Sequence, residues 1–141
     1  MRWVTRERAK VDRIACPWLI KKFVDPNAEF LFVPADKVLP TAESTKAIPF
    51  DVEGVQFGHR GDKCTFDAII EKYNLKDVAL HELAKIVRGA DTDAKDLTAY
   101  SNGLEAVAEG FRLISKDDFE NMEKQFPVYD ALYAFCKMKL R

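Results

Sequence analysis

The sequence predicts an α+β fold, with a small mixed sheet in the first half covered by a largely helical second half. Two observations support this class. Before residue 64, short apolar runs alternate with turn formers, and five of the six prolines lie before residue 50. After residue 64, apolar residues recur at the three- and four-residue spacing of helices. The 141 residues suit one domain and no Gly/Ser-rich linker divides them, so residues 1–141 are predicted to form a single domain.

The first half is predicted to contain short strands and one early helix. The apolar runs at Trp3–Thr5, Glu29–Val33, Ala47–Phe50 and Val55–Phe57 are typical of strands. Between the first two runs, apolar residues in the range Val11–Phe23 recur at helical spacing. A strand, a helix and a strand in this order indicate a right-handed crossover, so we expect the sheet to be at least partly parallel.

Three helices are predicted in the stretch that follows residue 64. The first begins at Thr65 and closes near Asn74. The second has Asp77 as its N-cap and Gly89 at its C-terminal end, because these residue types satisfy the unpaired backbone groups there. A third is indicated by the apolar stripe within Leu104–Leu113.

The chain is predicted to end in two helices separated by a proline. The first opens at Ser115, with Asp118 three residues later as a weak capping box. Pro127 then interrupts the pattern, because a proline costs a helix interior about 3 kcal/mol but suits a first turn. We therefore expect a new helix from Pro127 to about Met138, with Cys136 on its buried face.

Composition excludes several classes of protein. The 22 Lys and Arg residues nearly balance 23 Asp and Glu residues, which argues against tight binding of duplex DNA by phosphate neutralisation alone. No apolar run approaches the roughly 20 residues needed to span a bilayer. Three widely spaced cysteines do not form a disulfide framework. These features predict a soluble, reduced, cytoplasmic protein.

The segment Lys10–Ile20 is the first that concentrates reactive side chains. If its helix is continuous, Asp12 and Cys16 are neighbours one turn apart. If Pro17 is instead the first helical residue, Cys16 is the N-cap, where the helix dipole and Arg13 would stabilise a thiolate. A third interpretation is a small buried cysteine that only packs.

The segment Phe57–Asp67 is the second, and it supports two opposite chemistries. His59, Arg60 and a helix N-terminus could bind an anion. Alternatively, His59 and Cys64 could bind a transition metal ion together with Cys16 and with Asp62 or Asp67. The spacing matches no established zinc signature, and a tight loop with a helix cap is the simplest interpretation.

The segment Arg88–Asp96 begins like a calcium-binding loop but departs from that pattern. Lys95 occupies a ligand position, and Asp96 stands where the pattern needs glycine. A helix that ends at Gly89, followed by a new N-cap at Asp93, explains the segment more simply. Asp91 and Asp93 remain candidate binding residues.

Taken in chain order, Lys10–Ile20, Phe57–Ala68 and Val87–Asp93 resemble the ChrB-type chromate-resistance domain of bacteria. Glu29–Pro34, Ala47–Asp51 and Tyr129–Tyr133 are also similar to it, so the resemblance covers nearly the whole chain. It implies a role in the response to chromate stress. The residues that match its motifs are Asp12, Arg13, Cys16, His59, Arg60, Cys64, Asp67, Asp91 and Asp93.

Three functions compete on this basis. The one we favour is the sensing or binding of chromate or a similar oxyanion by Arg13, Arg60 and His59, near the helix that begins at Thr65. The second is a metal-dependent protein or enzyme with His59, Cys64 and Cys16 as ligands of a transition metal ion. The third is a stand-alone interaction domain without a small-molecule site. The expected partner is thus a small oxyanion or a metal ion; turnover and homo-oligomer formation are left open.

Two further expectations concern the arrangement of these residues. The segments Asp12–Cys16 and Gly58–Cys64 are predicted to meet in one cleft, because the early helix packs on a sheet whose later strand ends near Gly58. Cys16 and Cys64 are predicted to have lowered thiol pKa values and to react before Cys136.

Overall fold

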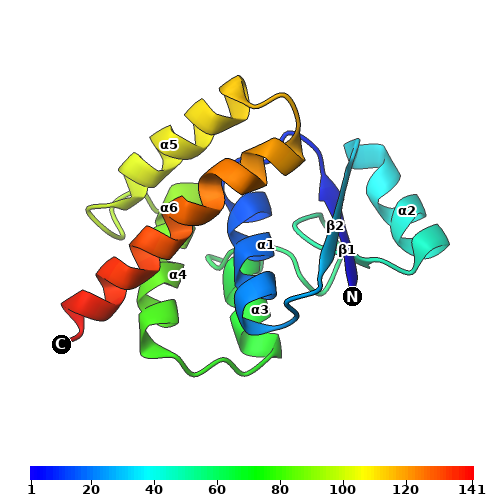
Figure 1. The fold of residues 1–141 in the computed structure, drawn as a ribbon. Coiled ribbons are helices and arrows are strands. Elements are labelled where there is room, and N and C mark those ends of the chain that lie inside the picture. Colours follow the sequence, from blue (N-terminus) through cyan, green and yellow to red (C-terminus); the bar gives the residue numbers. More distant parts are fainter.

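The computed structural model describes all residues from Met1 to Arg141 and confirms the α+β class (Figure 1). Its strands are β1 (Arg2–Arg6), β2 (Glu29–Val33) and β3 (Ile48–Pro49). Its helices are α1 (Asp12–Phe23), a 3₁₀ turn at Ala35–Lys37, α2 (Val38–Thr45), α3 (Thr65–Lys72), α4 (Val78–Asp91), α5 (Ser101–Ile114) and α6 (Asp118–Lys139). None of the helices is long and apolar enough to cross a membrane.

The three strands form a sheet in the order β2-β1-β3, and every strand pair is parallel rather than mixed. The register pairs Trp3 with Phe30 and Val4 with Leu31. Because side chains alternate across a strand, β1 contributes to two cores. Trp3 belongs to the main core, which includes α1, whereas Val4 packs with Val38 of α2 on the opposite face. The sheet therefore lies between α2 and the rest of the helices (Figure 1).

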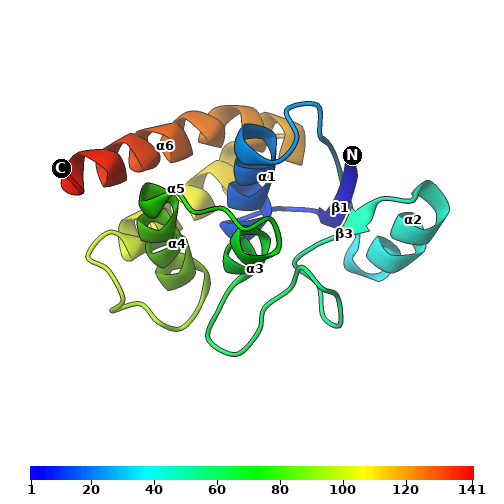
Figure 2. The same cartoon turned by 90° about the horizontal axis from the view of Figure 1, so that it is seen from below.

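The helices of the second half pack on α1 and on one another, as the two views show (Figures 1 and 2). Trp18 of α1 contacts the rings of Tyr129 and Tyr133 on α6, with ring centroids 6.1 and 5.8 Å apart. A single main core of 29 buried residues results. This packing holds α1, α3 and α4 around one end of the sheet.

Two parts of the first half differ from the sequence-based expectation. The predicted strand at Val55–Phe57 is reduced to an isolated parallel bridge between Phe50 and Phe57. Helix α2 was not expected, because Val38 is its only fully buried residue and no apolar stripe therefore marks it in the sequence. The long connection between β3 and α3 is mostly irregular (Figure 2).

Helix α4 does not end at Gly89, as predicted, but continues to Asp91. Thr92 is the C-cap residue, and the Asp77 side chain caps the N-terminus as expected. Gly89 serves close packing: a Cβ atom there would lie 2.8 Å from Cβ of Ser101, the first residue of α5. The extra half-turn places Asp91 beside α1.

Helix α6 is also continuous, although a break at Pro127 was predicted. Proline removes one backbone donor, and its would-be partner is the carbonyl of Glu123 one turn earlier. Both Glu123 and Pro127 are exposed, so water can satisfy that carbonyl while the buried face continues through Gln125 and Tyr129. The N-cap is Asp117 rather than Ser115, and its side chain accepts a hydrogen bond from the Glu120 backbone N–H.

Replacing Gly89 with alanine is expected to lower the free energy of unfolding by about 1–3 kcal/mol, because the new methyl group overpacks the contact with Ser101. Gly110 is the matched control, since it lies inside α5 and has open space at its Cβ position. Gly110→Ala should stabilise the protein by up to about 1 kcal/mol through helix propensity. Urea denaturation of the two variants measures both effects; equal changes would contradict the packing role of Gly89.

Candidate functional site

His59 lies at the centre of a cluster of three aspartates. Its Nε2 atom is 2.9 Å from Oδ2 of Asp91, 3.1 Å from Oδ1 of Asp51 and 3.5 Å from Oδ2 of Asp12. The potential ligand atoms of these four residues all lie within 4.8 Å of one another. Four separate segments of the chain therefore converge on one point.

Asp12 joins α1 to the N-terminus of α3. It is the first residue of α1, and its carboxylate accepts hydrogen bonds from the backbone N–H groups of Thr65 (2.8 Å) and Phe66 (3.2 Å). Because the first N–H groups of a helix have no partner within it, this buried carboxylate satisfies two of them. The segments Asp12–Cys16 and Gly58–Cys64, which were predicted to share a cleft, thus meet at Asp12. Its carboxylate also lies 3.5 Å from Nε2 of His59 in the second segment.

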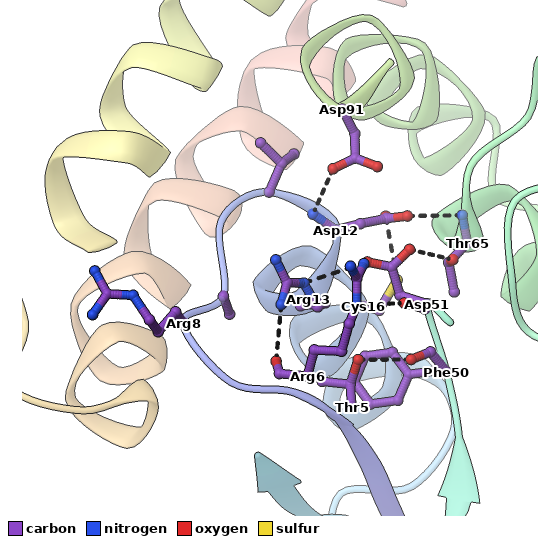
Figure 3. Close-up of polar contacts among 12 residues, drawn as sticks. Thr5, Arg6, Arg8, Asp12, Arg13, Cys16, Phe50, Asp51, Thr65 and Asp91 are labelled. Carbon is purple, nitrogen blue, oxygen red and sulfur yellow. Dashed lines mark hydrogen bonds and ion pairs between the residues drawn. The ribbon is translucent and has the colours of Figure 1, made fainter. Parts of the chain in front are cut away.

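Asp51 lies two residues after the end of β3, at the carboxyl end of the parallel sheet (Figure 3). Its Oδ1 atom accepts a hydrogen bond from the Thr65 hydroxyl at 3.1 Å. Arg6 and Arg13 lie beside its other oxygen, with nitrogen atoms 3.4 and 3.5 Å away. Arg6 is the last residue of β1, so two neighbouring parallel strands deliver charged side chains to one edge, where open sheets of this kind commonly bind ligands.

Asp91 ends α4 and completes the cluster. Its Oδ1 atom accepts a hydrogen bond from the backbone N–H of Asp12, and its side chain is 14% exposed. Asp93, only two residues later, is exposed and has no side-chain contact of this kind. Of the two aspartates predicted in this segment, the structure brings only Asp91 into the cluster.

The electrostatics of the cluster are dominated by buried negative charge. Burial, followed by the repulsion of Asp91, raises the pKa of Asp12 to about 7. Hydrogen bonds to the carboxylates, led by Asp12, raise the pKa of His59 to about 12. The two shifts have different main causes, burial for Asp12 and carboxylate hydrogen bonds for His59, but both reflect three carboxyl groups gathered around one imidazole.

The two cysteines of the predicted site contact carboxylates rather than His59. Cys16 Sγ donates to Asp12 at 3.4 Å, one turn along a continuous α1, and Cys64 Sγ donates to Asp67 at 3.4 Å. Both side chains are fully buried. Burial raises the pKa of each thiol, and nearby carboxylates raise it further. The expected lowering of these pKa values is therefore wrong, although Cys64 does stand at the N-cap of α3.

All three cysteines should therefore react slowly in the native protein. Cys136 is buried as predicted, and its thiol pKa is also raised by burial. Because thiolate and access are both needed for alkylation, iodoacetamide at neutral pH should label Cys16, Cys64 and Cys136 only when the chain opens. Mass spectrometry of labelled peptides, with urea-unfolded protein as the control, measures this. Fast labelling of Cys16 or Cys64 alone would contradict it.

The remaining predicted residues are divided between the site and its surroundings. Arg13 belongs to the site through Asp51. Asp67 lies outside the cluster and holds neighbouring elements in place. Its carboxylate accepts two hydrogen bonds from the Arg88 guanidinium and one from the Cys64 backbone N–H. Arg60 is exposed and donates to the Gln56 carbonyl, away from the cluster.

Asp51, Arg6 and Arg88 were missed as functional candidates. Asp51 has a left-handed backbone conformation, with φ of +54°, which no local sequence pattern predicts. The only signal in the sequence was that Asp51 and Arg6 each follow an expected strand. Asp51 and Arg6 are neighbours only because β1 and β3 are adjacent and parallel in the sheet.

Two cavities open on this cluster and share Arg6, Asp51 and His59. The smaller, of about 290 Å³, we call the basic cavity, because Lys10, Arg13 and Arg112 also line it. The larger, of about 620 Å³, lies between the site, α2 and residues 52–58. Five of its 11 lining residues are hydrophobic, and we call it the apolar cavity after the wall that these five form.

Comparison with known proteins identifies the family of the chain. The family model described as "ChrB, C-terminal domain" matches residues 3–136. Protein ChrB of Cupriavidus metallidurans is 33% identical over 132 residues, which cover 93% of this chain and 39% of that relative. The chain thus spans about two fifths of the relative's length, and no solved structure matches it. The resemblance indicated by the sequence motifs is confirmed, and the chain belongs to the ChrB C-terminal domain family.

Proposed function

We propose that this domain binds a divalent metal ion through Asp12, Asp51, His59 and Asp91, in a role related to chromate resistance. One observation carries the proposal: three carboxylates and one imidazole from four separate segments present their ligand atoms within 4.8 Å of one another. The family membership supports the relation to chromate resistance.

The charge of the cluster supports a metal ion over a purely structural ion pair. A histidine needs one carboxylate partner to be held in place, whereas His59 has three. Asp12 is fully buried, and burying a carboxylate is costly unless a cation compensates it. Of the three carboxylates, Arg6 and Arg13 pair only with that of Asp51. A metal ion in place of the imidazole proton would compensate all three carboxylates at once.

The donor set also indicates which ions fit. Three oxygen donors and one imidazole nitrogen suit Mn²⁺, Fe²⁺, Co²⁺ or Zn²⁺ better than ions that need thiolates. His59 is common to this set and to the sequence-based set with Cys16 and Cys64. The carboxylates take the place of the thiols, because both sulfur atoms donate hydrogen bonds and therefore carry their protons.

Titration of the chelator-treated protein with Mn²⁺ tests the proposal. Electron paramagnetic resonance reports free Mn²⁺, so at protein concentrations well above the dissociation constant the signal should stay suppressed until one equivalent per chain has been added. We expect dissociation constants in the range of about 1–100 μM, as for a half-open site in water. No binding of Mn²⁺ or Zn²⁺ at about 1 mM would overturn the proposal.

A second candidate function is the binding of chromate or a similar oxyanion in the basic cavity. Four basic side chains, those of Arg6, Lys10, Arg13 and Arg112, line its 290 Å³. The Nε atom of Arg112 is buried and has no hydrogen-bond partner. A tetrahedral oxyanion would supply acceptors for these donors, and a metal ion at His59 would add a further positive charge.

Chromate or sulfate is therefore expected to raise the melting temperature of the metal-loaded protein, since a ligand that binds only the native state stabilises it. Arg112→Gln should weaken this shift, whereas Lys116→Gln, an exposed residue outside the cavity, should not. Differential scanning fluorimetry with chloride at equal ionic strength as the control measures it. An absence of any oxyanion-dependent shift would exclude this second function.

A further inference from the structure

The lining of the apolar cavity has a polar end and an apolar wall, and a metal site alone needs no such wall. Its polar end is formed by Arg6, Asp51 and His59, and it is therefore continuous with the metal site. The other lining residues come from α2 and the turn before it and from the connection that follows β3. Its apolar wall consists of Ala35, Val38, Leu39, Val52 and Val55.

The apolar wall is built partly on α2 and the turn before it, and partly on the irregular connection that follows β3. Val38 is fully buried and anchors α2 against β1 through Val4. On the opposite side, the connection folds tightly on itself: a Cβ atom at Gly58 would lie 2.9 Å from the Val52 carbonyl oxygen. Leu39 nevertheless remains 53% exposed beside this space. The wall is thus anchored at Val38 and at Gly58 and is only partly covered.

The volume of about 620 Å³ lies within the range of pockets that hold small organic molecules. The polar end determines which kind of molecule fits. With a divalent cation at the three carboxylates, the adjacent Arg6 and Arg13 make the region net positive, so an oxygen-donor anion is favoured there. Glu53 is the other acidic residue of the lining, and it is exposed, where water screens its charge.

We propose that the apolar cavity binds the body of a small organic carboxylate whose head group reaches the metal ion and Arg6. This inference rests on the metal site proposed above and adds the class of its ligand. The carboxylate binds at the polar end, and an aliphatic or aromatic body of moderate size covers Leu39, Val52 and Val55. Burial of that body supplies affinity that the head group alone lacks.

The test uses the full chain loaded with Zn²⁺ and three probes: 3-phenylpropanoate, acetate and 3-phenylpropanol. Acetate has the head group without the body, and 3-phenylpropanol has the body without the charge. By NMR titration, 3-phenylpropanoate should bind at least about tenfold more tightly than either. The amide signals of Leu39, Val52 and Val55 should shift in this titration.

A pair of variants tests the location. Leu39→Glu should reduce the preference for 3-phenylpropanoate over acetate to about twofold or less, with Zn²⁺ affinity unchanged. Leu113→Glu is the matched control, because Leu113 is a 73% exposed leucine of α5 outside the cavity. Equal affinities for 3-phenylpropanoate and acetate would overturn this inference alone. Failure of Zn²⁺ itself to bind would overturn both this inference and the metal site.

Discussion

Replacing Asp91 with asparagine should weaken Mn²⁺ binding by at least about 100-fold. The substitution removes a charged ligand from a cluster in which the ion must replace the proton shared with His59. Loss of even an outer contact to a metal ligand typically costs 10–100-fold in affinity, and loss of a direct ligand should cost at least as much. The asparagine retains an oxygen that can accept the hydrogen bond from the Asp12 backbone N–H, so the fold should persist.

Asp93→Asn provides the matched control for this experiment. It makes the same chemical change two residues away, on an exposed side chain outside the cluster. Calorimetric titration of the two variants and the wild type with Mn²⁺ gives the affinities, and circular dichroism verifies the fold. Equal affinities for Asp91→Asn and the wild type would mean that Asp91 is no ligand. The metal site would then have to be abandoned in this form.

Replacing Arg88 with alanine should lower the free energy of unfolding by about 2–4 kcal/mol. Arg88 makes two hydrogen bonds of 3.0 Å to the Asp67 carboxylate, whose side chain is only 8% exposed. Removing one partner of a largely buried pair leaves the other charge without compensation. The loss should also weaken metal binding, because Arg88 links α4, which carries Asp91, to the N-terminus of α3 beside Asp12.

Lys85→Ala is the control on the same helix. Lys85 pairs with Glu82 at the surface, and exposed pairs of this kind contribute less than about 1 kcal/mol. The double variant Arg88→Ala/Asp67→Asn should recover part of the lost stability, since it removes the uncompensated charge. Urea denaturation of these three variants and the wild type measures this. Equal effects of Arg88→Ala and Lys85→Ala would show that the Asp67 pair is no more important than a surface pair.

Local patterns in the sequence determined much of the fold. The apolar spacing of α1, α3, α4 and α5 is strong enough to predict these helices, and the Asp77 cap was recognisable because capping depends on a few adjacent residues. The crossover from β1 to β2 also indicated parallel pairing correctly. Two of the exceptions, Gly89 and Pro127, are positions where the packing or exposure of a helix face overrides a local preference.

The candidate site was only partly contained in these patterns. The motifs around Asp12, His59 and Asp91 were visible as segments, and the crossover predicted that the first two would meet. Which atoms face one another was decided by tertiary structure. Burial turned Cys16 and Cys64 into protonated donors to carboxylates, although a helix N-terminus favours a thiolate. The parallel pairing of β1 with β3 brought Arg6 to Asp51 across 45 residues of sequence, a proximity that no local spacing records.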